Sequence, residues 1–113
     1  MNDRPEWQNL TRDEQLVFAG LVRVLVRMDG TFSTEEVKAV HRVATELGTK
    51  AFWAAMTESQ NALPTVDDVI ASVTEVTDPR TRTWMYALLL EVANVDGLDV
   101  SEQQMLMWLA NTW

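Results

Sequence analysis

The feature that most constrains the fold of this chain is an apolar segment that ends in Asp-Gly and occurs twice. The longer copy, Trp84 to Gly97, holds only Glu91 and Asn94 as strongly polar residues before its final Asp-Gly pair. A helix with this pattern is apolar around most of its circumference, so other helices must cover it. The shorter copy covers residues 16–30. We predict that the longer segment forms the central helix.

Local signals divide the chain into about six helices. Thr11, Ser33, Thr65 and Ser101 each begin a capping sequence, and Asp78-Pro79 is a further helix start. Glycines and prolines end the segments between them. The expected helices cover about residues 11–28, 33–47, 50–60, 65–76, 78–95 and 101–113. The valine-rich fourth segment leaves a strand as its alternative.

The chain length predicts one domain with one core. Residues 1–10 have little periodicity and are interpreted as an N-terminal extension, although Trp7 and Leu10 could pack back onto the domain. Residues 11–113 are predicted to form the helical domain. The expected fold class is therefore all-α: a compact bundle of about six helices.

Composition and charge exclude several classes of function. The chain has no cysteine, so disulfides, thiolate metal sites and cysteine nucleophiles are excluded. Its start is polar and acidic rather than signal-like, and no apolar run approaches a membrane span, so we expect a cytoplasmic protein. The net charge is −8, of which residues 51–113 carry −7. This sign disfavours nucleic acid and anionic membranes and favours cations and basic protein surfaces.

The two Asp-Gly segments resemble the TerB-like family, the small helical domain named for tellurite-resistance operons. The resemblance covers residues 17–47 and 87–109, about half of the chain, and rests on the sequences Met-Asp-Gly-Thr-Phe-Ser-Thr-Glu-Glu from residue 28 and Val-Asp-Gly-Leu-Asp-Val-Ser-Glu from residue 95. In each, an apolar helix ends in Asp-Gly and an acid-bearing helix follows. The second copy departs from the first by one inserted residue and by Gln104 in the place of Glu36.

This resemblance implies a bundle with two pseudo-symmetric helix-Asp-Gly-helix units and a link to tellurite or general stress responses. It also implies acidic residues that gather into a cation site. The family is not known for an enzymatic activity, and its members look like interaction or sensing modules.

The residues themselves allow a weak cation site but no complete EF-hand. Residues 29–36 match the second half of an EF-hand loop, whereas its first two ligand positions would be Leu25 and Arg27. The remaining hypothesis is that acids of both copies converge on a divalent cation such as calcium; these are Asp29, Glu36, Asp96 and Glu102. The alternative is that the aspartates organise turns and the glutamates cap helices.

Two isolated polar residues have structural interpretations. His41 is the only histidine, and the chain has no cysteine. We therefore expect His41 to have a structural role, and we do not expect the protein to be an enzyme. Glu91 lies in the most apolar segment. It is either buried and paired with Arg23 or Arg27, or it marks the solvent edge of the helix.

The five tryptophans suggest a partner surface. Trp84 and Trp108 fit the apolar stripes and are expected in the core, whereas Trp7, Trp53 and Trp113 lie near ends or edges. Exposed aromatic side chains often mark interfaces. The prediction is a non-catalytic, TerB-like, stress-linked module that acts through protein interaction and weak cation binding. The alternative is a small acidic adaptor or homodimer that binds no metal and uses Trp53 or Trp113 against a basic partner.

Overall fold

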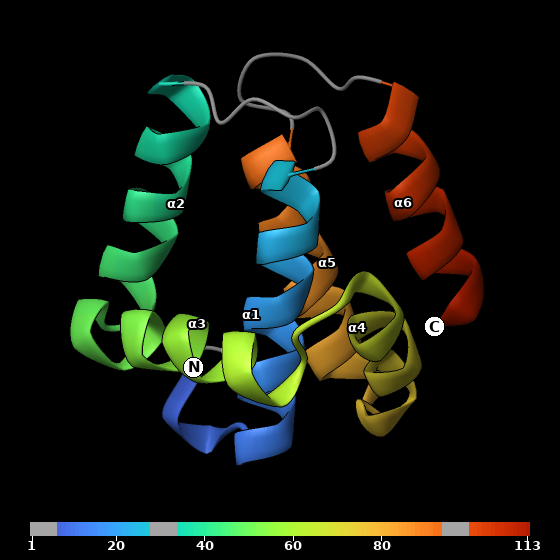
Figure 1. Cartoon of the computed structure of the whole chain (residues 1–113), viewed down its shortest axis with the longest axis horizontal. Helices are drawn as coiled ribbons and strands as arrows, with labels where there is room; N and C mark the ends of the chain where they lie inside the picture. The colour runs from blue at the N-terminus through green and yellow to red at the C-terminus, as the bar shows by residue number, and fades with distance from the viewer. Residues whose placement is uncertain (1–6, 28–33, 94–99) are drawn as a thin grey trace.

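Six α-helices and two short 3-10 helices make up the computed structural model, which describes residues 7–27, 34–93 and 100–113 (Figure 1). These residues contain no strand, so the all-α prediction is confirmed and the strand alternative for the fourth segment is wrong. The elements are η1 (Trp7–Asn9), α1 (Arg12–Arg27), α2 (Thr34–Leu47), α3 (Thr49–Ala62), α4 (Val66–Ser72), η2 (Val73–Glu75), α5 (Pro79–Ala93) and α6 (Val100–Thr112).

Side-chain caps begin several of these helices where the sequence predicted them. The Thr11 hydroxyl accepts from the Glu14 amide at 3.1 Å, and the Glu14 carboxylate accepts from the Thr11 amide at 2.9 Å. Thr65 and Asp68 form the same reciprocal pair at the start of α4. These bonds satisfy amides that have no partner inside the helix. Ser33 lies outside the described residues, and α6 begins at Val100, so Ser101 lies inside the helix rather than at its cap.

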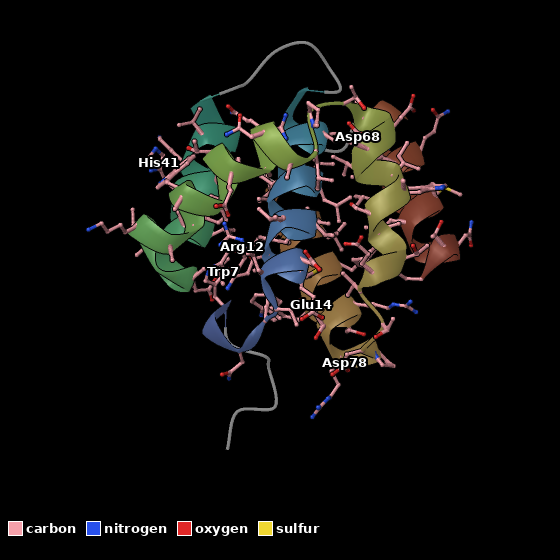
Figure 2. All side chains as sticks on the ribbon, turned by 60° about the horizontal axis from the view of Figure 1, so that its bottom comes forward. Trp7, Arg12, Glu14, His41, Asp68 and Asp78 are labelled. Carbon is pink, nitrogen blue, oxygen red and sulfur yellow. The ribbon has the colours of Figure 1, made fainter. Side chains whose placement is uncertain are left out.

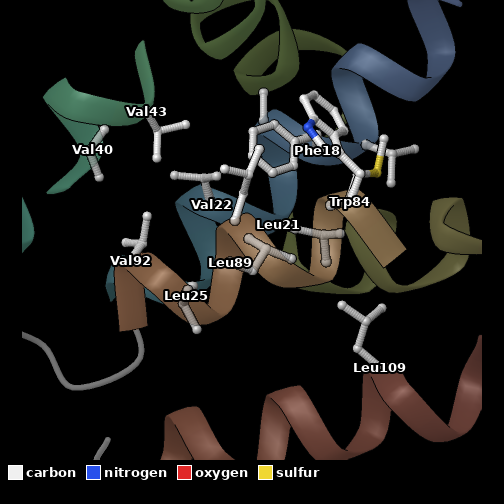
Figure 3. Close-up of a cluster of buried hydrophobic side chains, with 14 of the residues drawn as sticks. Phe18, Leu21, Val22, Leu25, Val40, Val43, Trp84, Leu89, Val92 and Leu109 are labelled. Atoms are coloured by element: carbon white, nitrogen blue, oxygen red, sulfur yellow. The ribbon is translucent and has the colours of Figure 1, made fainter. Parts of the chain in front are cut away.

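Helix α1 has more packing partners than α5, the helix that the sequence predicted as central. Every residue from 17 to 23 is buried, because α3, α4, η2 and α5 all pack against α1. Figure 3 shows Val22 of α1 in one buried cluster with Leu89 of α5 and Val43 of α2. Helix α5 packs on α1, α2 and α6 but keeps a solvent-facing stripe that includes Ala87 and Leu90. Apolar content alone therefore did not identify the central helix.

Four aromatic rings form the part of the core beneath η1. Phe18 lies 5.9 Å from Trp7, 6.0 Å from Trp84 and 6.4 Å from Phe52, measured between ring centroids. Trp7 is only 5% exposed, and Leu10 is also buried. The segment before α1 therefore packs back onto the domain.

A buried arginine links α1 to α3. The Arg23 Nη1 donates to the Ser59 hydroxyl at 3.3 Å and to the Leu63 carbonyl at 3.1 Å. Glu91, for which the sequence offered Arg23 as a partner, is exposed, and its Oε1 lies 4.0 Å from the Arg42 Nη1. The solvent-edge interpretation of Glu91 is therefore confirmed.

Helices α1 and α4 approach closely at Gly20. A Cβ atom built on this buried glycine would lie 3.0 Å from the Val69 Cγ2 atom. That distance is shorter than ordinary van der Waals contact, so the missing side chain lets Val69 reach the α1 backbone.

Candidate functional site

The four helix ends that flank the two Asp-Gly segments lie at one end of the bundle. Helices α1 and α5 end there, and helices α2 and α6 begin there, at the top of Figure 1. Asp29, Asp96 and the side chain of Glu36 lie outside the described residues. Glu102 lies in the first turn of α6 and is only 3% exposed.

These helix ends carry partial charges of opposite sign: positive where α2 and α6 begin and negative where α1 and α5 end. The start of α6 carries a partial positive charge, which stabilises the Glu102 carboxylate, and the ends of α1 and α5 present carbonyl oxygens of partial negative charge. Among the described residues, no three histidines or acids gather in a way that could hold a metal ion. The four-residue cation site stays a prediction.

Trp53, one of the two predicted partner residues, is half-buried against other rings. Its ring lies 5.5 Å from the His41 imidazole and 5.2 Å from the Phe52 ring. His41 also lines an open pocket of about 690 Å³ on α2 and α5. The other lining residues are Lys38, Arg42, Thr45, Glu46 and Glu91. Its two cationic and two anionic side chains balance, so this pocket favours no single ligand charge.

Trp113, the other predicted partner residue, is half-buried and hydrogen-bonded to two other elements. Its indole Nε1 donates to the Val73 carbonyl at 2.9 Å, which links it to η2. Its main-chain oxygen accepts from the Arg82 Nη1 at 3.2 Å, which links it to α5. It therefore holds the end of α6 in place. It also lines a pocket of about 410 Å³ between α5 and α6.

The two tryptophans expected in the core differ in exposure. Trp84 is buried, whereas Trp108 is only partly buried against the core. In α6 the buried positions are Met105, Leu106 and Leu109. The expectation for Trp108 is therefore only partly correct.

An acidic surface with exposed apolar side chains covers the outside of α4 and η2, and the sequence interpretation missed it. Val66 is 52% exposed and Ile70 42% exposed, and the same two elements carry the exposed acids Asp67, Asp68 and Glu75. We name these five residues the α4 face. Figure 2 labels Asp68 on α4, which lies on the side of α1 away from α2.

The valine-rich pattern hid this surface. The apolar residues of this segment all fitted one helical stripe, but the buried positions are Val69, Val73 and Val76. Residues 66 and 70 lie at the edge of that stripe, and no helix in the described part of the chain covers them. The signal that could have found the face is the absence of any lysine or arginine between residues 51 and 79, where five acids occur.

The described hydroxyl groups mostly serve helix geometry. Several threonines and serines donate to a carbonyl one turn earlier in their own helix; these are Thr45, Ser59, Ser72, Thr83 and Thr112. A hydroxyl in such a bond uses its hydrogen as the donor to a backbone carbonyl. Of these five, Thr45 lines the same pocket as His41, and its hydroxyl donates to the His41 carbonyl at 2.9 Å.

Comparison with family models, with curated proteins and with solved structures finds no match to this chain. The TerB-like resemblance therefore rests on the two Asp-Gly segments alone. Within the described part of the chain, no helix combines the length and apolar character needed to cross a membrane.

Proposed function

We propose that this chain is a non-catalytic interaction module that binds a basic, amphipathic segment of a protein partner through the α4 face. The observation that carries the proposal is that Val66 and Ile70 are exposed on α4, while α4 and η2 together also expose Asp67, Asp68 and Glu75. Val66 and Ile70 are four residues apart, so they lie on the same side of α4. Such a pair matches the apolar stripe of a docking helix.

The negative charge around the α4 face favours a positively charged partner. No cation lies between residues 51 and 79, so lysines or arginines of a partner would meet Asp67 and Glu75 without local repulsion. Complementary charge raises the association rate and the specificity more than the final affinity. The apolar pair contributes the affinity: burying the exposed half of each side chain is worth about 1 kcal/mol.

The use of polar side chains supports a module without catalysis. His41 is exposed and contacts the ring of Trp53 rather than a nucleophile. The hydroxyls named above bond to helix carbonyls. Nucleophilic catalysis requires a nucleophile and a base positioned by further side chains.

A synthetic amphipathic Leu/Lys helix tests the proposal, with its Leu/Glu counterpart as the charge control. Isothermal titration calorimetry should show binding of the Leu/Lys peptide alone. The double variant Val66→Ser, Ile70→Ser should weaken it by about 10–30-fold, since two half-exposed apolar side chains are lost. The control Met107→Ser, at a residue of α6 that is 64% exposed, should leave it unchanged. Equal binding to the wild type and the double variant would refute the role of the α4 face.

We propose weak divalent-cation binding as a second function, at the end of the bundle where α2 and α6 begin. It is supported by the shared position of four helix ends and by the buried carboxylate of Glu102. Titration with calcium, magnesium and then manganese, followed in proton-nitrogen correlation spectra, should give saturable shifts confined to Asp29, Glu36, Asp96 and Glu102. Glu102→Gln should abolish them, whereas Glu75→Gln should not. Unmoved resonances at millimolar calcium would end this hypothesis.

The link to tellurite or general stress is proposed from the TerB-like resemblance alone. Cells that produce the wild-type chain should survive tellurite better than cells that produce the Val66→Ser, Ile70→Ser variant at the same level. Equal survival of the two kinds of cells would contradict a role of this chain, through the α4 face, in tellurite resistance.

A further inference from the structure

The geometry points to a binding site for a small planar aromatic carboxylate in the pocket between α5 and α6. The pocket has a volume of about 410 Å³ and is lined by Pro79, Arg82, Thr83, Tyr86, Ala110 and Trp113. This size falls within the range typical of small-molecule sites. The inference concerns different residues from the α4 face and does not depend on it.

The apolar part of the site comes from two aromatic side chains and two small apolar ones. Tyr86 lies on α5 and Trp113 follows the end of α6, so aromatic surface comes from both sides of the pocket. The hydrogen bond from the Trp113 Nε1 to the Val73 carbonyl fixes the indole ring before any ligand binds. A preorganised aromatic surface suits a flat ring, because offset stacking adds to the burial of apolar area.

Arg82 supplies the group that would recognise a carboxylate. Its Nε donates to the Val76 carbonyl at 2.6 Å, and its Nη1 donates to the main-chain oxygen of Trp113 at 3.2 Å. Within the described residues, the Nη2 atom has no hydrogen-bond partner. Two bonds hold the guanidinium plane while three N–H donors remain, two of them on Nη2, and a guanidinium binds carboxylates in a defined geometry.

The charges near this pocket favour an anion despite the net charge of the protein. Arg80 and Arg82 are the only cationic residues between 51 and 113. Arg80 lies 3.7 Å from Asp78, which offsets its charge, and no side-chain carboxylate of the described residues lies within ion-pair distance of Arg82. Among the residues that line the pocket, Arg82 has the only charged side chain.

The test uses three ligands that share one ring system: indole-3-acetate, indole-3-acetamide and 3-methylindole. Calorimetry with the whole chain should show indole-3-acetate binding at least about tenfold more tightly than the other two, since only it forms a charged hydrogen bond with Arg82. Correlation spectra should place the shifts at Arg82, Tyr86 and Trp113. Equal binding of all three ligands, or binding of none, would overturn the inference.

Two variants of exposed alanines locate the site without touching the core. Ala110→Leu places extra atoms in the pocket, whereas Ala87→Leu makes the same change on an exposed position of α5 outside it. Ala110→Leu should weaken indole-3-acetate binding by about tenfold or more, and Ala87→Leu should leave it unchanged. Arg82→Gln should remove the preference for the acetate over the acetamide. Binding that survives Ala110→Leu would place the ligand elsewhere and refute the assignment.

Discussion

Replacement of Trp7 by alanine tests whether the segment before α1 is an appendage or part of the core. Trp7 is 5% exposed and lies 5.9 Å from Phe18 and 6.1 Å from Phe52 between ring centroids. A buried aromatic side chain removes about 150–250 Å² from water, which at about 25 cal/mol per Å² sets an upper bound of about 4–6 kcal/mol. Measured losses for Trp or Phe to Ala in cores are about 3–5 kcal/mol.

The expected result for Trp7→Ala lies at the lower part of that range, about 3 kcal/mol, because a terminal segment can detach instead of leaving an empty cavity. Urea unfolding followed by circular dichroism should show this loss, and the melting temperature should fall by roughly 10–20 °C. Met107→Ala, at a residue that is 64% exposed, is the control and should change the free energy of unfolding by less than about 0.5 kcal/mol. A Trp7→Ala variant as stable as this control would show that residues 7–10 contribute nothing to the core.

Three further substitutions test individual contacts through the same unfolding measurement. In a Val69→Ala background, Gly20→Ala should stabilise the protein by about 1 kcal/mol, because the contact at 3.0 Å is gone and alanine has the higher helix propensity. In the wild type, Gly20→Ala should stabilise the protein by less than this or destabilise it. Equal effects in the two backgrounds would contradict the close approach of Val69 to Gly20. Thr65→Ala should cost about 1 kcal/mol through loss of the capping box, whereas Thr74→Ala, at an exposed threonine, should cost less than about 0.5 kcal/mol. Arg23→Ala should lower the free energy of unfolding by about 2–4 kcal/mol, because the Ser59 hydroxyl and the Leu63 carbonyl lose their donor and the missing aliphatic stem leaves a cavity. A decrease of less than about 1 kcal/mol would show that these hydrogen bonds contribute little to stability.

Helix starts could be predicted because their signals are local. The pair Thr11 and Glu14, and the pair Thr65 and Asp68, each lie within one helical turn, so the residues that form the bonds are adjacent in the sequence. Gly48 was predicted to end a helix, and it adopts a φ of 103°, which favours glycine. Signals of this kind do not depend on how the helices pack.

Properties that depend on packing could not be predicted in the same way. Periodicity places Arg23 on a helix, but its burial follows from the position of Ser59 and Leu63 on another segment. Likewise, the apolar character of Ile70 does not tell whether another helix covers it. For the candidate sites, the acids of the Asp-Gly segments were identified by spacing, whereas the pocket at Arg82 arises only where α5 meets α6.

The central position of α1 has a consequence for the time course of folding on the ribosome. This helix is made early, but α5, which covers one of its sides, begins only at Pro79, about 50 residues after α1 ends. At about 5–20 residues per second, the apolar surface of α1 stays open on that side for roughly 3–10 s during synthesis. A nascent chain in this state is a substrate for chaperones that bind exposed apolar segments. The protein should therefore depend on such help most strongly when translation is slow between α1 and α5.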